Sequence, residues 1–254
     1  MPRHKETSAL RTPKAKGVVR DDERAVHWLL KAAKQGRPFA QVRLGNMFAE
    51  GRGVQHDDIQ AAQWYRRAAD QGHAEAQYKL GAMYADGRGL TKDEKQAVEW
   101  YRKAAKQEDP RAEFKLGVMY LRGRGVPQDY EEALKWFQRS AEQGDPGAQF
   151  NMGHMYASGK GVKQDYLKAS NWYRKAAEQG DARAQVALAG QYALGLGVTR
   201  DNVEAYKWAI LAEANDDRDG TLIRGRVEQK MTSREIDEAK RRAKAIFVSL
   251  EKLR

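Results

Sequence analysis

The residues most able to bind a metal ion are the five histidines, because the chain contains no cysteine. A zinc site needs several ligands that converge on one point, often from positions one helical turn apart. No histidine stands four residues from another ligand type in a convincing metal-binding pattern. We therefore predict surface histidines, with no metal site and no cofactor. The histidines are His4, His27, His56, His73 and His154.

The segment from Gly153 to Gly161 shows only a superficial likeness to a phosphate-binding loop. The spacing from Gly153 to Gly159-Lys160 is one residue too long, and Gly161 stands where Ser or Thr would bind magnesium. No serine lies in a nucleophile-elbow sequence. Since no residue is a candidate for catalysis, we predict that the protein is not an enzyme.

A basic residue recurs at a constant spacing of 36 residues, at Arg67, Lys103, Arg139 and Lys175. The side chain four residues earlier varies along the chain, and positions four apart share one helical face. Together these positions form a ridge, which comprises Gln63, Arg67, Glu99, Lys103, Lys135, Arg139, Asn171, Lys175 and Lys207.

The ridge has two interpretations. Its cations stand in the last turn of a predicted helix, where they offset the helix dipole. Alternatively, they form a basic strip that binds an acidic protein segment or a polyanion. Side chains that differ from repeat to repeat on a constant helical scaffold would determine which partner binds. We therefore predict that the ridge is the partner-binding surface.

The whole chain follows the same 36-residue period, which is the signature of a solenoid of stacked repeats. Glycines mark it at Gly17, Gly53, Gly89, Gly125, Gly161 and Gly197. Eleven residues after each glycine stands a tryptophan, and these six are all the tryptophans of the protein: Trp28, Trp64, Trp100, Trp136, Trp172 and Trp208.

Each repeat predicts two helices. An aspartate such as Asp129 precedes the first helix and can cap it, and apolar residues follow at helical spacing. Glycines end this helix at Gly36, Gly72, Gly144 and Gly180, whereas the third repeat has Glu108, so its turn should differ. The second helix carries a glycine at its centre, at Gly45, Gly81, Gly117 and Gly153, which predicts close approach of a partner helix.

The run from Trp172 to Gly180, the Leu-Gly-x-Met-Tyr second helix and the Gly-x-Gly-Val turn resemble the Sel-1-like repeat family, relatives of tetratricopeptide repeats. The resemblance covers residues 17–214. It implies an all-α, right-handed superhelical solenoid of antiparallel helix pairs that acts as a bacterial scaffold or adaptor for protein partners and catalyses no reaction. Some members carry a disulfide in each repeat, which this chain cannot form. The repeats are residues 17–52, 53–88, 89–124, 125–160 and 161–196, followed by the first helix of a sixth, 197–214.

The two ends depart from the repeat. Residues 1–16 are basic and aperiodic, and we predict disorder there. In the extension 215–254, Thr232-x-x-Glu235 forms a capping box before an amphipathic helix at about 232–251. We expect this helix to cap the stack and cover the apolar pair Ile210-Leu211. The alternative is a free amphipathic helix that binds a membrane or a partner.

The net charge of +11 is concentrated at the ends of the chain. Such a charge keeps a protein soluble or attracts nucleic acid and anionic membranes. No apolar run is long enough to span a bilayer, and no secretory signal is visible, which predicts a cytoplasmic monomer. A trimmed N-terminus or another export route would place the same chain in the periplasm or outside the cell. We predict a protein-binding scaffold, with polyanion binding as the alternative.

Overall fold

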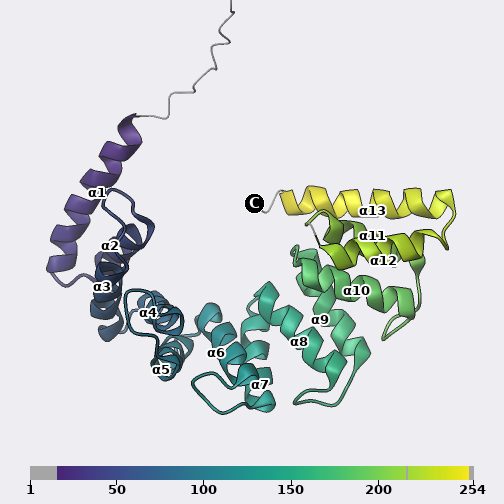
Figure 1. The fold of residues 1–254 in the computed structure, drawn as a ribbon, viewed down its shortest axis with the longest axis horizontal. Helices are drawn as coiled ribbons and strands as arrows, with labels where there is room; N and C mark the ends of the chain where they lie inside the picture. The colour runs from purple at the N-terminus through teal and green to yellow at the C-terminus, as the bar shows by residue number, and fades with distance from the viewer. Residues whose placement is uncertain (1–15, 216, 252–254) are drawn as a thin grey trace, which may run out of the picture. The chain divides into compact units, whose positions relative to one another are not determined.

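The computed structural model describes residues 16–215 and 217–251, and within these residues the regular structure is entirely helical (Figure 1). This confirms the predicted all-α class. The predicted disorder of residues 1–16 falls outside the described residues, except for Lys16, which begins a helix. The helices are α1 (Lys16–Lys34), α2 (Pro38–Glu50), α3 (Asp58–Asp70), α4 (Ala74–Asp86), α5 (Glu94–Ala105), α6 (Pro110–Arg122), α7 (Tyr130–Glu142), α8 (Pro146–Ser158), α9 (Tyr166–Glu178), α10 (Ala182–Leu194), α11 (Asn202–Glu213), α12 (Arg218–Glu228) and α13 (Ser233–Glu251).

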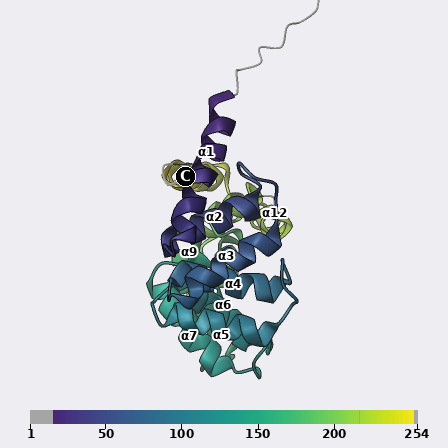
Figure 2. The same ribbon diagram turned by 90° about the vertical axis from the view of Figure 1, so that its left-hand side faces the viewer.

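The described residues divide into two compact units, one that ends at Ala104 and one that begins at Ala105. In the first unit, α1 packs on α2, α2 on α3 and α3 on α4, so consecutive helices form antiparallel pairs (Figure 2). The second unit continues in the same way from α6 to α11. Odd-numbered helices from α3 to α11 are the first helices of the repeats, and even-numbered helices are the second helices.

Aspartates and glycines set the helix ends as the sequence predicts. The side chain of Asp57 accepts a hydrogen bond of 2.9 Å from the backbone N–H of Gln60, and Asp165 caps α9 in the same way. The glycines after the first helices have a positive φ, as expected. Glu108 also adopts this left-handed conformation, with φ of 60°, so the expectation of a different turn is wrong in this respect.

The central glycines of α2, α4, α6 and α8 each make room for an aromatic ring of the next repeat. A Cβ added to Gly45 would lie 2.6 Å from the ring of Tyr65, and one added to Gly117 would lie 2.6 Å from the ring of Phe137. Gly81 and Tyr101 form the same contact in the first unit, at 2.9 Å. Distances this short are prohibitive, so only glycine lets the first helix approach. The predicted packing role of these glycines is confirmed.

The first repeat departs from the later ones. Gly17 is in phase with the turn glycines Gly53 and Gly89, but it lies inside α1. The helix therefore replaces the turn that precedes the first helix of the other repeats.

The sixth repeat is more complete than the sequence predicts. Residues 197–214 were expected to supply only a first helix, yet α12 follows and begins at Arg218, which is 36 residues after the start of α10 at Ala182. The side chain of Asp217 caps α12 by accepting from the backbone N–H groups of Asp219 and Gly220.

The C-terminal helix α13 packs on α11, close to its predicted bounds of 232–251. Its Ala239 and Ala243 are buried in the same apolar cluster as Leu211, while Ile210 packs against that cluster. Within the second unit, α13 therefore covers the apolar pair that would otherwise face solvent.

Candidate partner-binding surface

The first helices of the second to fifth repeats present the ridge to solvent. Its side chains in these repeats are all exposed, because the opposite faces of α3, α5, α7 and α9 carry the buried alanines and aromatic rings. The sequence therefore placed these eight positions on the correct face of their helices. They are Gln63, Arg67, Glu99, Lys103, Lys135, Arg139, Asn171 and Lys175.

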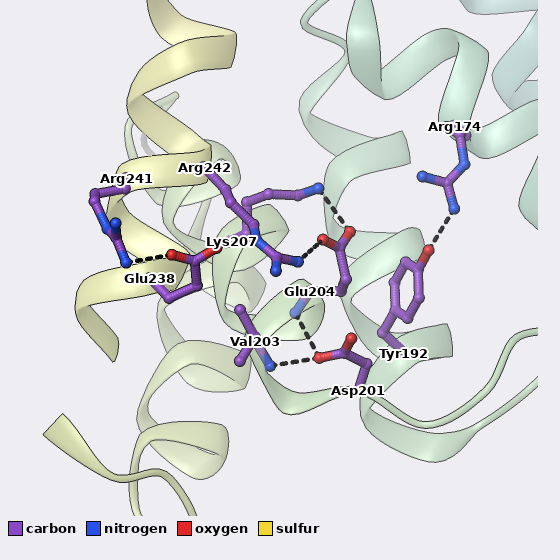
Figure 3. A network of polar contacts seen from close by, with 9 residues as sticks. All are labelled: Arg174, Tyr192, Asp201, Val203, Glu204, Lys207, Glu238, Arg241 and Arg242. Atoms are coloured by element: carbon purple, nitrogen blue, oxygen red, sulfur yellow. Dashed lines mark hydrogen bonds and ion pairs between the residues drawn. The ribbon is translucent and has the colours of Figure 1, made fainter. Parts of the chain in front are cut away.

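Lys207 is a correction to the predicted ridge. Its side chain is only 10% exposed, and its ammonium lies 2.6 Å from a carboxylate oxygen of Glu204. Arg242 of α13 reaches the other oxygen of Glu204 at 2.9 Å, as Figure 3 shows. Because this network joins α11 to α13, Lys207 serves the C-terminal cap and is not available as a partner contact.

The charge of Glu204 is favoured by this network. Burial alone would raise the pKa of Glu204, but hydrogen bonds and charge from Lys207 and Arg242 together hold that pKa below its ordinary value. Figure 3 also shows Arg241 on the outer side of α13, where it pairs with Glu238 and not with α11.

The four basic residues that recur every 36 residues each lie over the indole ring of their own helix, three residues earlier. The Lys103 ammonium is 3.6 Å from the centroid of the Trp100 ring, and the Lys175 ammonium is 4.3 Å from that of Trp172. Arg67 over Trp64 and Arg139 over Trp136 repeat the arrangement. The cations also stand in the last helical turns. The recurrence of these four cations therefore has a local structural cause. Their charged ends nevertheless remain exposed.

Several ridge charges are balanced by nearby side chains of opposite charge. Lys135 pairs with Glu132 at 2.7 Å, and Glu99 pairs with Arg102 at 2.7 Å. The ridge is consequently not a uniformly basic strip. Lys103 and Lys175 keep the most direct contacts with indole rings, while Gln63 and Asn171 supply neutral polar groups.

A ladder of buried glutamines lies behind the ridge. Gln77 donates from its side chain to the carbonyl of Ala69 at 3.2 Å, and Gln149 donates to Ala141 at the same distance. Gln149 also accepts a hydrogen bond of 2.8 Å from Gln179 of the next repeat. These bonds satisfy buried carbonyls and join successive repeats. Gln41 and Gln185 make the equivalent bonds in their repeats.

The third repeat replaces this glutamine with Glu113, which is not among the residues predicted from the sequence. The fully buried carboxylate pairs with Arg139 at 2.8 Å and accepts a hydrogen bond of 2.7 Å from Gln143. Burial raises the pKa of Glu113, although Arg139 and Gln143 oppose the shift. Arg139 is therefore engaged in the fold as well as in the ridge. The 36-residue period could have identified Glu113 from the sequence, because this residue stands 36 residues after Gln77.

The described residues contain no cluster of histidine, aspartate and glutamate that could hold a metal ion. Within the same part of the chain, no helix combines the length and apolar character needed to cross a membrane.

Comparison with protein families decides the classification. A model of the Sel1 repeat matches residues 14–36, 38–73, 74–109, 110–145, 146–181 and 182–217. The chain belongs to the Sel1 repeat family. The Sel1 repeat of the family model starts with the second helix of the repeat defined above. The two definitions therefore cover the same helices but divide the chain at different points.

Solved Sel1 structures support this assignment. The chain is 40% identical to a Sel1 repeat protein from Oxalobacter formigenes, with a TM-score of 0.73 over 77% of this chain and 78% of that one. A putative Sel1 repeat protein from Klebsiella pneumoniae is 21% identical, with a TM-score of 0.50 over 80% and 99% of the two chains. The immunity protein Pa5087 from Pseudomonas aeruginosa is 23% identical, with a TM-score of 0.50 over 82% and 84%. The last two show the fold alone. No curated protein sequence matches the chain.

The Sel1 fold commonly mediates protein–protein interaction, and its repeats are typically non-catalytic. In this Sel1 protein, the ridge of the first helices stays exposed, while the opposite side of these helices packs in the interior.

Proposed function

We propose that the protein is a non-catalytic scaffold that binds a protein partner through the ridge of its first helices. The observation that supports this proposal is that the repeats share their buried positions but differ at an exposed one. Every first helix from α3 to α9 buries the same alanine and aromatic positions, while its exposed position four residues before the cation changes from Gln63 to Glu99, Lys135 and Asn171.

The preferred partner is an acidic or helical protein segment. Lys175 presents its ammonium 4.3 Å from the centroid of the Trp172 ring, which is only half-buried, so the ridge offers charge and some apolar area together in this repeat. An amphipathic segment with carboxylates can use both, in the manner of a helix that lies in a groove. A polyanion would use only the charge and would meet Glu99 and Glu132 on the same helices.

Affinity capture from lysate with charge-reversed variants tests the proposal. We expect Lys103→Glu and Lys175→Glu to lose the partner that the wild-type protein retains. Lys92→Glu and Lys163→Glu are matched controls, because they make the same charge change in the turns of the same repeats, where both lysines are exposed. Retention of the partner by all four variants would contradict the proposal.

The salt dependence of the captured complex separates a protein partner from a polyanion. A nucleic-acid complex that involves several phosphate contacts weakens by roughly a thousandfold or more between low and moderate salt. A ridge that also uses indole faces should lose far less affinity. Steep salt dependence, together with nuclease sensitivity of the captured material, would favour the polyanion instead.

A further inference from the structure

The N-terminal helix α1 exposes an apolar face that the later first helices bury wholly or in part. Trp28 is 66% exposed, whereas Trp64 at the same repeat position is 6% exposed. Ala25, Leu29 and Ala32 are only half-buried, although their equivalents in α3 are buried. The face has the composition of a repeat interface but no described helix on its outer side.

The second repeat shows what covers such a face. Trp64 of α3 lies in one apolar cluster with Leu44 of α2, and Phe48 packs against that cluster. Gly45 provides the close approach, because its missing Cβ leaves room for the ring of Tyr65. The covering helix thus presents a leucine, a glycine directly after it, and an aromatic residue one turn after the leucine.

The open face of α1 continues into a groove of ≈ 560 Å³ between α1 and α2. Trp28, Leu29, Phe39 and Met47 supply its apolar lining, and Arg43 lies over the ring of Phe39. Phe39 is itself 63% exposed. Two large exposed aromatic side chains on one groove mark an interaction site more often than an ordinary surface. Figure 2 shows α1 beside α2 in this unit.

We propose that this groove binds an amphipathic α-helix of a partner protein, in the way that α3 is covered by α2. The partner helix carries leucine followed directly by glycine or alanine, with an aromatic residue one turn after the leucine. This is the pattern Leu44-Gly45 with Phe48, and Leu80-Gly81 with Tyr84. The site is distinct from the ridge, because Trp28 and Leu29 stand at the positions that the later repeats bury.

A second copy of the chain does not present this pattern at its C-terminal end. In α12, the last second helix, the leucine and aromatic positions are occupied by Arg224 and Glu228. These residues form an ion pair with each other at 2.7 Å. The helix that would have to continue the stack is therefore charged where the groove is apolar.

Fluorescence anisotropy with the full-length protein tests the proposal. The probe is a fluorescein-labelled synthetic peptide with the sequence of residues 73–88, which carries Leu80, Gly81 and Tyr84, held helical by a lactam bridge between exposed positions. We expect saturable binding to the wild-type protein and at least tenfold weaker binding to Trp28→Glu. Since Trp28 is exposed, the variant should keep the circular dichroism spectrum of the wild type. Lys34→Glu is the control on the same helix, because Lys34 is exposed and does not line the groove, and it should bind like the wild type.

Equal binding to the wild type and to Trp28→Glu, or no saturable binding to the wild type, would overturn the proposal. So would a homodimer in sedimentation experiments that Trp28→Glu abolishes, because the occupant would then be a second copy. Peptide binding that appears only after deletion of residues 1–15 would point to the chain's own segment as the occupant and would also overturn it. Lys103→Glu and Lys175→Glu should bind the peptide normally, so this test and that of the ridge can fail separately.

Discussion

The ring of Tyr173 lies directly on Gly153: a Cβ added to this glycine would come within 2.5 Å of the ring atom Cδ1. The contact joins the second helix of one repeat to the first helix of the next. It recurs at Gly45, Gly81 and Gly117, each of which faces an aromatic ring of the following repeat. In the fifth repeat the position is Ala189, and the residue that replaces the ring is Ala209, so the larger side chain on one helix is matched by a smaller one on the other. Both alanines are fully buried.

Gly153→Ala should therefore destabilise the protein even though alanine is the better helix former. The added methyl group has no space, and overpacking of this kind costs about 1–3 kcal/mol. The control is Gly190→Ala in the neighbouring helix α10, where an added Cβ meets nothing within 4 Å. There the substitution should stabilise by up to about 1 kcal/mol through helix propensity. Urea denaturation midpoints measure both effects, and similar shifts in the two variants would contradict the packing role.

Glu113→Gln should restore the glutamine that the other repeats have and make stability less dependent on pH. Because burial raises the pKa of Glu113, the folded state holds the proton more tightly than the unfolded chain. The stability associated with this proton is present at low pH and is lost as the pH rises through the raised pKa. As the pH rises through the raised pKa, the free energy of unfolding of the wild type should therefore fall relative to that of Glu113→Gln. Denaturation midpoints of both proteins across the acid range measure the difference.

Arg139→Ala should destabilise the wild-type protein at neutral pH, because it leaves the buried Glu113 carboxylate without its cation. A cost of about 1–3 kcal/mol is expected for a buried polar group that loses its partner. In the Glu113→Gln background the same change should cost much less, since no buried charge remains. Equal costs in the two backgrounds would show that the ion pair does not contribute.

Arg242→Ala should loosen the attachment of α13 to α11, at a cost of about 1 kcal/mol for a hydrogen-bonded ion pair with one partner largely exposed. The control is Arg241→Ala, whose side chain is 76% exposed and pairs only with Glu238 among the described residues, so its effect should stay within about 0.5 kcal/mol. The pKa of Glu204 is lowered, so its stabilising effect is present at neutral pH and is lost as the pH falls through that lowered pKa. The difference between Arg242→Ala and the wild type should shrink over the same range in thermal unfolding.

Deletion of residues 231–254 should lower the melting temperature and promote self-association. The removed helix buries Ala239 and Ala243 against the cluster that contains Leu211, and its loss exposes that apolar surface. Light scattering and thermal unfolding follow the two effects. A truncated protein that melts like the wild type and stays monodisperse would show that α13 is not a cap.

Much of the architecture could be predicted because the packing rules repeat. Six tryptophans in one phase, together with the central glycines, fixed the helix pairs and the buried faces. The second helix α12 escaped prediction because its apolar signature is lost, with Arg224 where Leu188 stands one repeat earlier. The start position, the capping Asp217 and Gly225, which is in phase with Gly153, still follow the period.

The sequence predicted which helical face carries the candidate surface, but it did not predict which charged side chains pair there. A fixed repeat step identifies exposed positions, yet it cannot show that Lys207 is covered by α13 and held by Glu204. Nor could it show that Glu113 engages Arg139, since that contact depends on which side chains meet between α6 and α7. The exposure of Trp28 also required the structure, because its sequence context matches that of the buried Trp64.

Photo-crosslinking from the ridge tests the central claim most directly. A benzophenone amino acid placed at Asn171, which is exposed on α9, should crosslink to a discrete protein in lysate from the source organism. The same group at Lys163, exposed in the turn before α9, should not crosslink to that protein. A discrete adduct from position 171 alone is the result we predict. Identical adducts from both positions, or a partner captured only from position 163, would contradict binding by the first-helix ridge.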